Sequence, residues 1–357
     1  MMVVTLTAAL PVTPTAELTA EPTAAPTTTP TSTPPPIPTP VATPNPGPLL
    51  AAANAGLARV HAQAGDATLV CLRYDDLDAD GAPEWFALTH QATVSPTRLS
   101  AFVLDEPEAY PLDPAYPQPS APDIGLGQYA VCDIEIRDLN ADGRTEIAIF
   151  GHGAGNETLL HIFAWNGERY QRLGRFAGDA GVLLKNVDGD LATEIWEGYR
   201  VQGTDDFAWY AIHTWTGQSY GWTSDRYDWF YLTRPHNYRS DKPDYAVISF
   251  YLAIDDRDLP GAYALLAPAD DRPYEGWALG YATTLRVDAG NVHTIPGTVS
   301  DTSARVATII TTWDNESGGV VRRLWNVEWQ TARTAEGWRL VAATSELLEE
   351  GPVSYWK

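Results

Sequence analysis

An acidic stretch of nine residues occurs three times in the chain: Asp76-Leu77-Asp78-Ala79-Asp80-Gly81-Ala82-Pro83-Glu84, Asp138-Leu139-Asn140-Ala141-Asp142-Gly143-Arg144-Thr145-Glu146 and Asn186-Val187-Asp188-Gly189-Asp190-Leu191-Ala192-Thr193-Glu194. Carboxylates or amides stand at positions 1, 3, 5 and 9 of every copy. A short loop with oxygen donors at alternate positions can curl around Ca²⁺, which takes about six to eight oxygen ligands. The spacing therefore predicts three related cation-binding loops.

Each predicted loop has the same set of donors. We expect the side chains at positions 1, 3, 5 and 9 and the backbone carbonyl at position 7 to hold the ion. Gly81 and Gly143 permit the sharp turn at position 6, where the third copy has Leu191. Because the third loop also begins with an amide, we expect it to bind more weakly. The candidate metal ligands are Asp76, Asp78, Asp80, Ala82, Glu84, Asp138, Asn140, Asp142, Arg144 and Glu146 in the first two loops, and Asn186, Asp188, Asp190 and Glu194 in the third.

These loops have two other possible interpretations. An EF-hand or dockerin loop needs an acidic ligand at position 12, where the copies have Ala87, Ile149 and Glu197. A solvated acidic turn needs only Asp, Asn and Gly, which are common turn residues. Three copies in register with a shared Glu favour the cation site over both.

The periodicity continues beyond the loops. The segment Trp165-Asn166-Gly167-Glu168-Arg169-Tyr170 matches Trp215-Thr216-Gly217-Gln218-Ser219-Tyr220, and the first copy keeps Tyr110. Each unit therefore follows the order acidic loop, strand, polar turn, strand, glycine turn, strand. This order predicts an antiparallel β-meander, which must stack on its neighbours to bury its faces.

Over about residues 70–232 these units resemble the FG-GAP/VCBS repeats of secreted and cell-surface proteins, whose blades build β-propellers with a Ca²⁺ loop in each blade. The resemblance implies an all-β, propeller-like domain with structural Ca²⁺ as its cofactor. Three copies are fewer than the roughly four to eight blades of a closed propeller. We therefore expect an open or atypical propeller, completed by flanking strands.

The two cysteines of the chain each precede an acidic loop. Cys71 lies five residues before Asp76, and Cys132 lies six residues before Asp138. Equivalent strands of neighbouring repeats could bring them together, and export would oxidise them. We therefore hypothesise a disulfide, although the difference of one residue could also turn the two side chains to opposite faces.

The first 50 residues contain no Lys, no Arg and no aromatic residue, but 13 of the 28 prolines. Proline fixes φ and removes a backbone donor, so residues 13–50 are predicted to be an extended Thr/Pro-rich linker. The apolar residues 1–12 are interpreted as the remnant of a signal or anchor segment that starts upstream. The alternative is the disordered N-terminus of a cytosolic protein.

The pattern of apolar and polar residues changes in the C-terminal part of the sequence. The repeat domain is predicted over 51–235 and an α+β domain over 236–357, whose 122 residues are enough to fold independently. Apolar periodicity predicts helices at 245–254, 259–266 and 275–283, and strands at 306–313, 320–331 and 337–343. Over about 240–346 this arrangement is similar to the nuclear transport factor 2-like cone fold.

That cone fold occurs both in ketosteroid isomerase-like enzymes and in proteins without catalysis. Isomerase chemistry needs a carboxylate base in an apolar pocket with hydrogen-bond donors opposite. The candidates are Asp255 and Asp258 as base and Tyr251, Tyr263 and Tyr281 as donors. We interpret the acids instead as a helix end and a helix cap, and the tyrosines as core. A cone interior filled by tryptophans favours binding or scaffolding, and the candidates for this filling are Trp277, Trp313, Trp325 and Trp329.

Charge and hydropathy exclude further classes of function. The chain has 23 Lys and Arg against 46 Asp and Glu, a net charge of −23, which disfavours binding to nucleic acid. After residue 50 nothing approaches the run of about 18 apolar residues that a membrane helix needs. The sequence predicts a secreted or surface-tethered, calcium-stabilised binding or scaffold protein of a bacterial cell envelope, without enzymatic activity. Its partner would be a protein or glycan at the cell surface. The alternative is an extracytoplasmic enzyme or small-ligand carrier that uses the C-terminal pocket.

Overall fold

The computed structural model describes residues 47–91, 98–105, 107–112, 132–153, 155, 157–186, 190–230, 236–268 and 273–353. The chain divides into two compact units, one of Thr5–Ala58 and one of Arg59–Lys357 with Met1–Val4. The four sheets of the described residues belong to the larger unit. The division of that unit into a domain at 51–235 and one at 236–357 stays a prediction.

The first described element is a helix that the sequence analysis missed. Helix α1 (Gly47–Ala64) begins inside the predicted linker and crosses the predicted boundary at residue 50. Its Pro48 suits the first turn of a helix, and the alanines that follow have the highest helix propensity. Near its end, Val60 is fully buried against Ala87 and Phe102. None of the helices in the described part of the chain is long and apolar enough to cross a bilayer.

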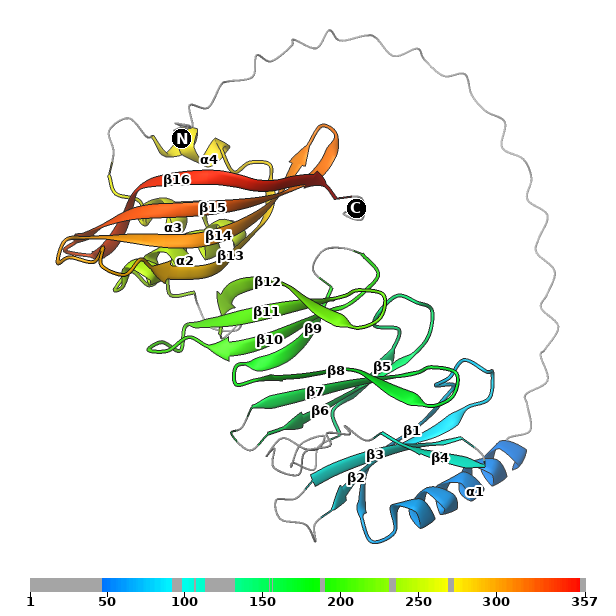
Figure 1. Ribbon diagram of the computed structural model, residues 1–357. Helices are drawn as coiled ribbons and strands as arrows, with labels where there is room; N and C mark the ends of the chain where they lie inside the picture. Colours follow the sequence, from blue (N-terminus) through cyan, green and yellow to red (C-terminus); the bar gives the residue numbers. More distant parts are fainter. Residues whose placement is uncertain are drawn as a thin grey trace, which may run out of the picture. The chain divides into compact units, whose positions relative to one another are not determined.

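Three four-stranded antiparallel sheets follow α1, each a simple meander (Figure 1). The predicted all-β character of this part is therefore confirmed. The described residues of this part form three sheets, which is fewer than the roughly four to eight blades of a propeller. A closed propeller is therefore not shown. Their strands are β1 (Thr68–Asp75), β2 (Glu84–Gln91), β3 (Arg98–Asp105) and β4 (Glu108–Pro111); β5 (Ile134–Arg137), β6 (Glu146–His152), β7 (Thr158–Trp165) and β8 (Tyr170–Gly178); and β9 (Gly181–Lys185), β10 (Glu194–Arg200), β11 (Phe207–Trp215) and β12 (Tyr220–Trp229).

The middle sheet is buried on both faces. Ile147 and Ile149 of β6 share a core with residues of the first sheet, whereas Ala148 between them packs in a core with Ile195 of the third sheet. Successive side chains of a strand point to opposite faces, so this alternation joins three sheets through two cores. The sheets therefore stack on one another, as the meander prediction required.

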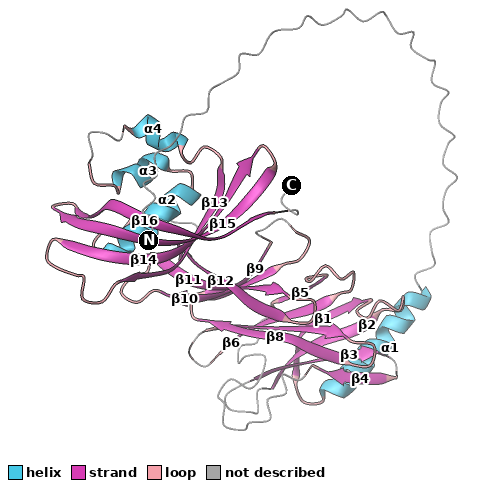
Figure 2. Ribbon diagram, turned by 45° about the horizontal axis from the view of Figure 1, so that its top comes forward, coloured by secondary structure: helices cyan, strands magenta, loops and turns pink. Residues whose placement is uncertain are grey.

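The C-terminal part has the predicted α+β plan, with three helices followed by a four-stranded antiparallel sheet in the order β13-β14-β15-β16. Helix α2 lies along this sheet (Figures 1 and 2), and its residues from Tyr245 to Ile254 are all buried. Asp258 caps α3 by accepting from the amide of Gly261 at 3.0 Å, as expected. The elements are α2 (Pro243–Asp255), α3 (Leu259–Ala264), α4 (Tyr274–Leu279), β13 (Thr284–Thr294), β14 (Ser303–Glu316), β15 (Gly319–Thr334) and β16 (Gly337–Pro352).

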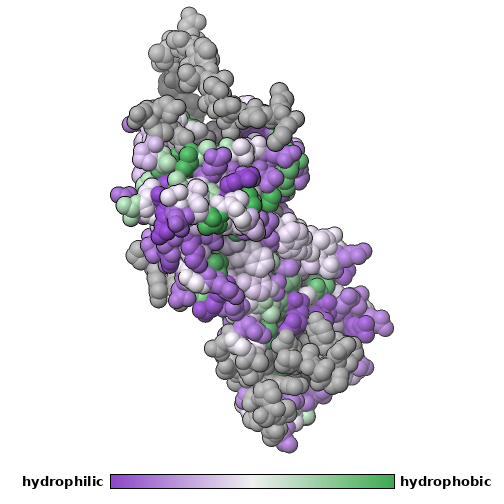
Figure 3. Space-filling model, turned by 60° about the vertical axis from the view of Figure 1, so that its left-hand side comes forward, coloured by the Kyte–Doolittle hydropathy of each residue, from purple (hydrophilic) through white to green (hydrophobic). Residues whose placement is uncertain are grey.

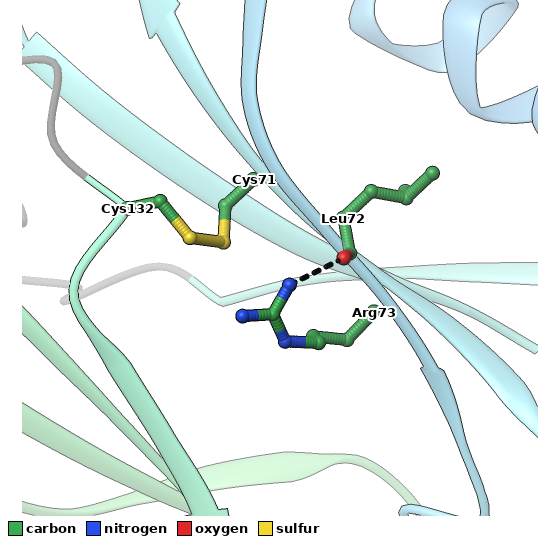
Figure 4. Close-up of a disulfide and its surroundings, with 4 residues drawn as sticks. All are labelled: Cys71, Leu72, Arg73 and Cys132. Carbon is green, nitrogen blue, oxygen red and sulfur yellow. Dashed lines mark hydrogen bonds between the residues drawn. A yellow bond between two sulfur atoms is a disulfide. The ribbon is translucent and has the colours of Figure 1, made fainter.

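Cys71 and Cys132 form a disulfide, which confirms the hypothesised pairing (Figure 4). Their Cα atoms are 5.2 Å apart. Cys71 lies within β1, whereas Cys132 precedes the first residue of β5. Because Cys132 is outside its strand, strand alternation does not fix its direction, and the difference of one residue is harmless. The disulfide links the first sheet to the chain that enters the second.

A buried histidine lies in the middle sheet. His161 of β7 is fully buried, and neither ring nitrogen has a hydrogen-bond partner among the described residues. Burial lowers the pKa of His161 to about 3, and the positive charges of Arg175 and Arg172 act in the same direction. The folded protein therefore holds this imidazole neutral over most of the acidic range.

We expect the stability of the protein to fall on acidification because of His161. Between pH 6.5 and 3 the unfolded chain binds a proton at this imidazole that the folded chain does not, so the free energy of unfolding falls as pH falls. The loss is about 3 kcal/mol at pH 4. Urea unfolding at pH 7 and pH 4 should show this extra loss in the natural chain and not in His161→Leu. Equal losses in both proteins would contradict the expectation.

Candidate metal centre

The first acidic loop connects β1 to β2, and Glu84 is the first residue of β2. The loop turns back on itself because Ala79 and Gly81 adopt left-handed backbone conformations, with φ of 65° and 92°. Such a φ is free of strain only for glycine, which explains the glycine at position 6. The second loop connects β5 to β6 with the same turn, where Ala141 and Gly143 have φ of 60° and 84°.

Backbone amides fix one oxygen of each carboxylate in the first loop. The amide of Gly81 donates to Asp76 Oδ2 at 3.1 Å, and the amide of Asp80 donates to Asp78 Oδ1 at 3.0 Å. Glu84 is 2% exposed, and its Oε2 accepts from the amide of Leu77 at 2.7 Å. The carboxylates are therefore oriented by the loop itself.

The same four side chains can together surround an ion. One oxygen from each of Asp76, Asp78, Asp80 and Glu84 can be chosen so that all lie within 4.8 Å of one another. Oxygens bound to one Ca²⁺ at 2.3–2.6 Å are at most about 5 Å apart. Asp76 Oδ1 is buried without a hydrogen-bond partner in the described residues. This cluster could therefore bind a metal ion, and the donor set of hard oxygens suits Ca²⁺.

Burial, and after it the charges of neighbouring acids, disfavours the ionised form of Glu84. Burial raises the pKa of Glu84 to about 7; the amide of Leu77 opposes this, and the charges of Asp78 and Asp105 add to it. Burial also raises the pKa of Asp105, which lies at the end of β3, with Asp78 and Asp80 contributing. A bound divalent cation would relieve this repulsion and favour the ionised form of all these groups.

The second loop repeats the fold of the first but differs at position 3. Gly143 donates to Asp138 Oδ2 at 3.0 Å, and the fully buried Glu146 accepts from Leu139 at 2.7 Å. Asn140 Nδ2, however, donates to Glu146 Oε1 at 3.1 Å and to Asp142 Oδ2 at 3.4 Å. The amide group thus already bridges two of the predicted ligands. Loop one is therefore the stronger candidate of the two.

The third loop is described only in part. Asp188 lies outside the described residues, so its role as a ligand stays a prediction. Asn186 donates to the backbone carbonyl of Asp190, and Leu191 is 86% exposed at the position of the missing glycine. Glu194 begins β10 and is buried, as the corresponding residues of the other loops are. The carbonyls of Ala82 and Arg144 at position 7 also remain predicted ligands.

Two of the candidates for isomerase chemistry, Asp255 and Tyr251, make hydrogen bonds within the fold. Asp255 accepts from Arg226 at 2.7 Å and from the amide of Val287 at 2.9 Å. Tyr251 accepts from the indole of Trp329 at 3.0 Å.

The tryptophans expected in the cone interior do not all lie there. Trp329 is in the main core, and Trp277 and Trp325 pack against it. Trp313 instead packs with Val320 on the other face of the sheet, which corrects the expectation for this residue. It is three positions from the core residue Ile310 of the same strand, and an odd separation places the two on opposite faces.

The similarity of the chain to known proteins was compared by sequence family, by curated sequence and by structure. No protein-family model matches the chain, and no curated protein matches it. Among solved structures, one match is a ketosteroid isomerase-like protein from Erwinia carotovora atroseptica, with 16% sequence identity and a TM-score of 0.25. The match covers 30% of this chain and 94% of the Erwinia protein. A second match is a protein of Bdellovibrio bacteriovorus, with 10% sequence identity and a TM-score of 0.22. This match covers 60% of this chain and 100% of the Bdellovibrio protein. Neither likeness bears on what this protein does.

Proposed function

We propose that the protein is an exported, non-enzymatic binding or scaffold protein of the cell envelope, whose β-sheet part is stabilised by Ca²⁺ in the first acidic loop. The observation that carries the proposal is the gathering of four carboxylates around one point, where Asp76 Oδ1 is buried without a hydrogen-bond partner among the described residues. A loop of this kind, fixed by its own amides, holds an ion for structure rather than for chemistry. In this proposal the three sheets are FG-GAP/VCBS-like repeats.

One feature supports export. The disulfide between Cys71 and Cys132 is compatible with an oxidising compartment, because cytosolic thiols are kept reduced. Figure 3 shows hydrophilic residues interspersed with hydrophobic ones on the face in view, and the net charge of the chain is −23. Neither feature distinguishes one compartment from another. The partner proposed outside the cytoplasm is a surface protein or glycan.

The packing of the C-terminal part supports a role without catalysis. We propose that α2–α4 and β13–β16 form a nuclear transport factor 2-like cone. Its interior is filled by aromatic side chains, with the ring of Phe250 5.3 Å from that of Trp329 and 6.2 Å from that of Trp277. A filled interior leaves an isomerase-type substrate no place beside a carboxylate base.

Thermal unfolding of the full chain tests the calcium part of the proposal. At a free Ca²⁺ concentration tenfold above Kd, a site adds about 1.4 kcal/mol to the free energy of unfolding. We expect Ca²⁺ to raise the midpoint by roughly 2–5 °C relative to EDTA, and Mg²⁺ to do much less because it resists full dehydration. Glu84→Gln should lose the response, whereas the exposed Glu346→Gln should keep it. Superimposed melts in EDTA, Ca²⁺ and Mg²⁺ would leave the loop as an ordinary acidic turn.

A further inference from the structure

The repeated segment that ends in Tyr170 and in Tyr220 forms the same tight hairpin in the second and third sheets. Each tyrosine is the first residue of a strand, β8 or β12. Tyr170 pairs with Trp165 across its turn, and Tyr220 pairs with Trp215. The ring centres of these pairs are 5.1 Å and 5.3 Å apart. The two repeats therefore hold their tyrosines in the same way.

Each of these tyrosines lies in a core with the acidic loop of the preceding sheet. Tyr170 of the second sheet shares a core with Leu77 of loop one. Tyr220 of the third sheet shares a core with Leu139, which has the same position in loop two. The stacking of the sheets therefore brings one tyrosine to each of the first two loops.

Both hydroxyls are buried and have no hydrogen-bond partner among the described residues. Tyr170 is 8% exposed and Tyr220 is 9% exposed. Burial raises the pKa of Tyr170 well above its usual value, and the charge of Glu84 adds to this effect. Burial also raises the pKa of Tyr220, where the charge of Glu146 adds to the effect and that of Arg137 opposes it. Each hydroxyl therefore lies close to the carboxylates of a loop but hydrogen-bonds to none of them.

A water on a bound cation would be a suitable partner for such a hydroxyl. A buried hydroxyl without a partner destabilises a fold, so two of them at equivalent positions point to a ligand at both loops. Ca²⁺ takes about six to eight oxygens, whereas one oxygen from each of four side chains and one backbone carbonyl make five. Water commonly bridges polar groups that are too far apart for a direct hydrogen bond. A tyrosine hydroxyl can accept from that water and donate to a carboxylate.

We propose that loops one and two form cation sites shared between adjacent sheets, in which Tyr170 and Tyr220 hold a water that completes the coordination of Ca²⁺. The loop of one sheet supplies the direct ligands, and the tyrosine of the next sheet fixes the water. The ion therefore ties two sheets together. The inference rests on the calcium site proposed above, and it adds loop two and a positioning residue for each loop.

The third loop has a different neighbour. Asp190 and Glu194 line a cavity whose opposite side is the C-terminal sheet. On that sheet Arg286 and Arg322 flank Trp313, and both arginines line the same cavity. Positive charges on that side disfavour a further cation. The position of the third loop therefore agrees with the weak binding expected from its sequence.

Tyr170→Phe tests the shared site, because it removes the hydroxyl and keeps the ring. Calorimetric titration of Ca²⁺ into the full chain should show the affinity of the main site reduced about three- to tenfold, as for the loss of one hydrogen bond. Urea unfolding in EDTA should show an unchanged or higher midpoint, because a buried hydroxyl without a partner is gone. Tyr220→Phe should leave the main site unchanged and weaken the second.

Tyr251→Phe is the matched control, because Tyr251 is buried in the C-terminal part and its hydroxyl accepts from Trp329. It should lower the midpoint in EDTA and keep the natural affinity for Ca²⁺. The two variants are thus expected to have opposite effects on stability and on affinity. A purely structural role of Tyr170 would make it behave as Tyr251 does.

Three results would overturn the shared site. One is natural affinity in Tyr170→Phe, the second is an equal loss of affinity in Tyr251→Phe, and the third is a lower midpoint of Tyr170→Phe in EDTA. If Glu84→Gln abolishes binding while Tyr170→Phe binds as tightly as the natural chain, the calcium proposal stands and the shared site alone fails. If the natural chain itself binds no Ca²⁺, both fail together.

Discussion

Arg226→Gln is expected to lower the free energy of unfolding by about 3–5 kcal/mol. Arg226 of β12 is only 7% exposed and contacts three carboxylates. Its guanidinium lies 3.2 Å from Asp228 and 2.7 Å from Asp255, and it also pairs with Asp288. Burial alone would raise the pKa of Asp288, but Arg286 and Arg226 hold it below its usual value. Without Arg226 these acids would be buried with too little positive charge.

Urea unfolding near pH 7 measures this loss. Arg305→Gln provides the matched control, because Arg305 pairs with Glu328 at the surface and such pairs contribute about 0–1 kcal/mol. A loss in Arg226→Gln no greater than in the control would show that the buried cluster does not hold the third sheet to the C-terminal part.

The same cluster changes the expectation for a fragment of residues 236–357. From its length we predicted that it folds independently. The structure places Phe207 and Trp229 of the third sheet in one core with Tyr245 of α2, and Arg226 beside Asp255. A fragment beginning at residue 236 would lack all three contributions, so we expect a longer fragment that also includes β11 and β12 to be the more stable of the two.

Removal of the disulfide is expected to lower the free energy of unfolding by about 4 kcal/mol. The cysteines are 61 residues apart, and the stabilisation by closing a loop of that length in the unfolded chain is of this order. Urea unfolding with and without reductant should show the loss in the natural chain. The double variant with Cys71→Ala and Cys132→Ala should be equally unstable in both conditions. Equal midpoints for the oxidised and reduced natural chain would contradict the prediction.

The β-sheet part was predictable because its signals are local and repeated. The second strand of each sheet begins at Glu84, Glu146 or Glu194. The three acidic loops therefore connect the first strand to the second in each meander. Helix α2 of the C-terminal part was predictable for a similar reason, since Tyr245 to Ile254 form an apolar run that only Ser249 interrupts. Secondary structure can be predicted from local patterns of this length without knowledge of tertiary contacts.

The remaining features depend on contacts between distant segments. Arg226 is 29 residues from Asp255 and 62 from Asp288, and each looks like an ordinary surface charge in the sequence. The row formed by Arg286, Trp313 and Arg322 likewise depends on the register of β13, β14 and β15, which sequence alone does not set. Helix α1 was missed because its alanine-rich run directly follows a proline-rich segment that favours extended chain.

Calorimetric titration of Ca²⁺ into the full chain, stripped of metal with a chelator, tests the central claim most directly. We expect saturable binding with Kd in the range of about 10⁻⁴–10⁻³ M, typical of extracellular modules. Glu84→Gln should abolish the main site and Glu346→Gln should keep it. Asn140→Asp should strengthen the second loop, because a carboxylate oxygen replaces the amide nitrogen that now bridges Glu146 and Asp142. Absence of saturable binding, or unchanged binding in Glu84→Gln, would contradict the assignment of loop one as a calcium site.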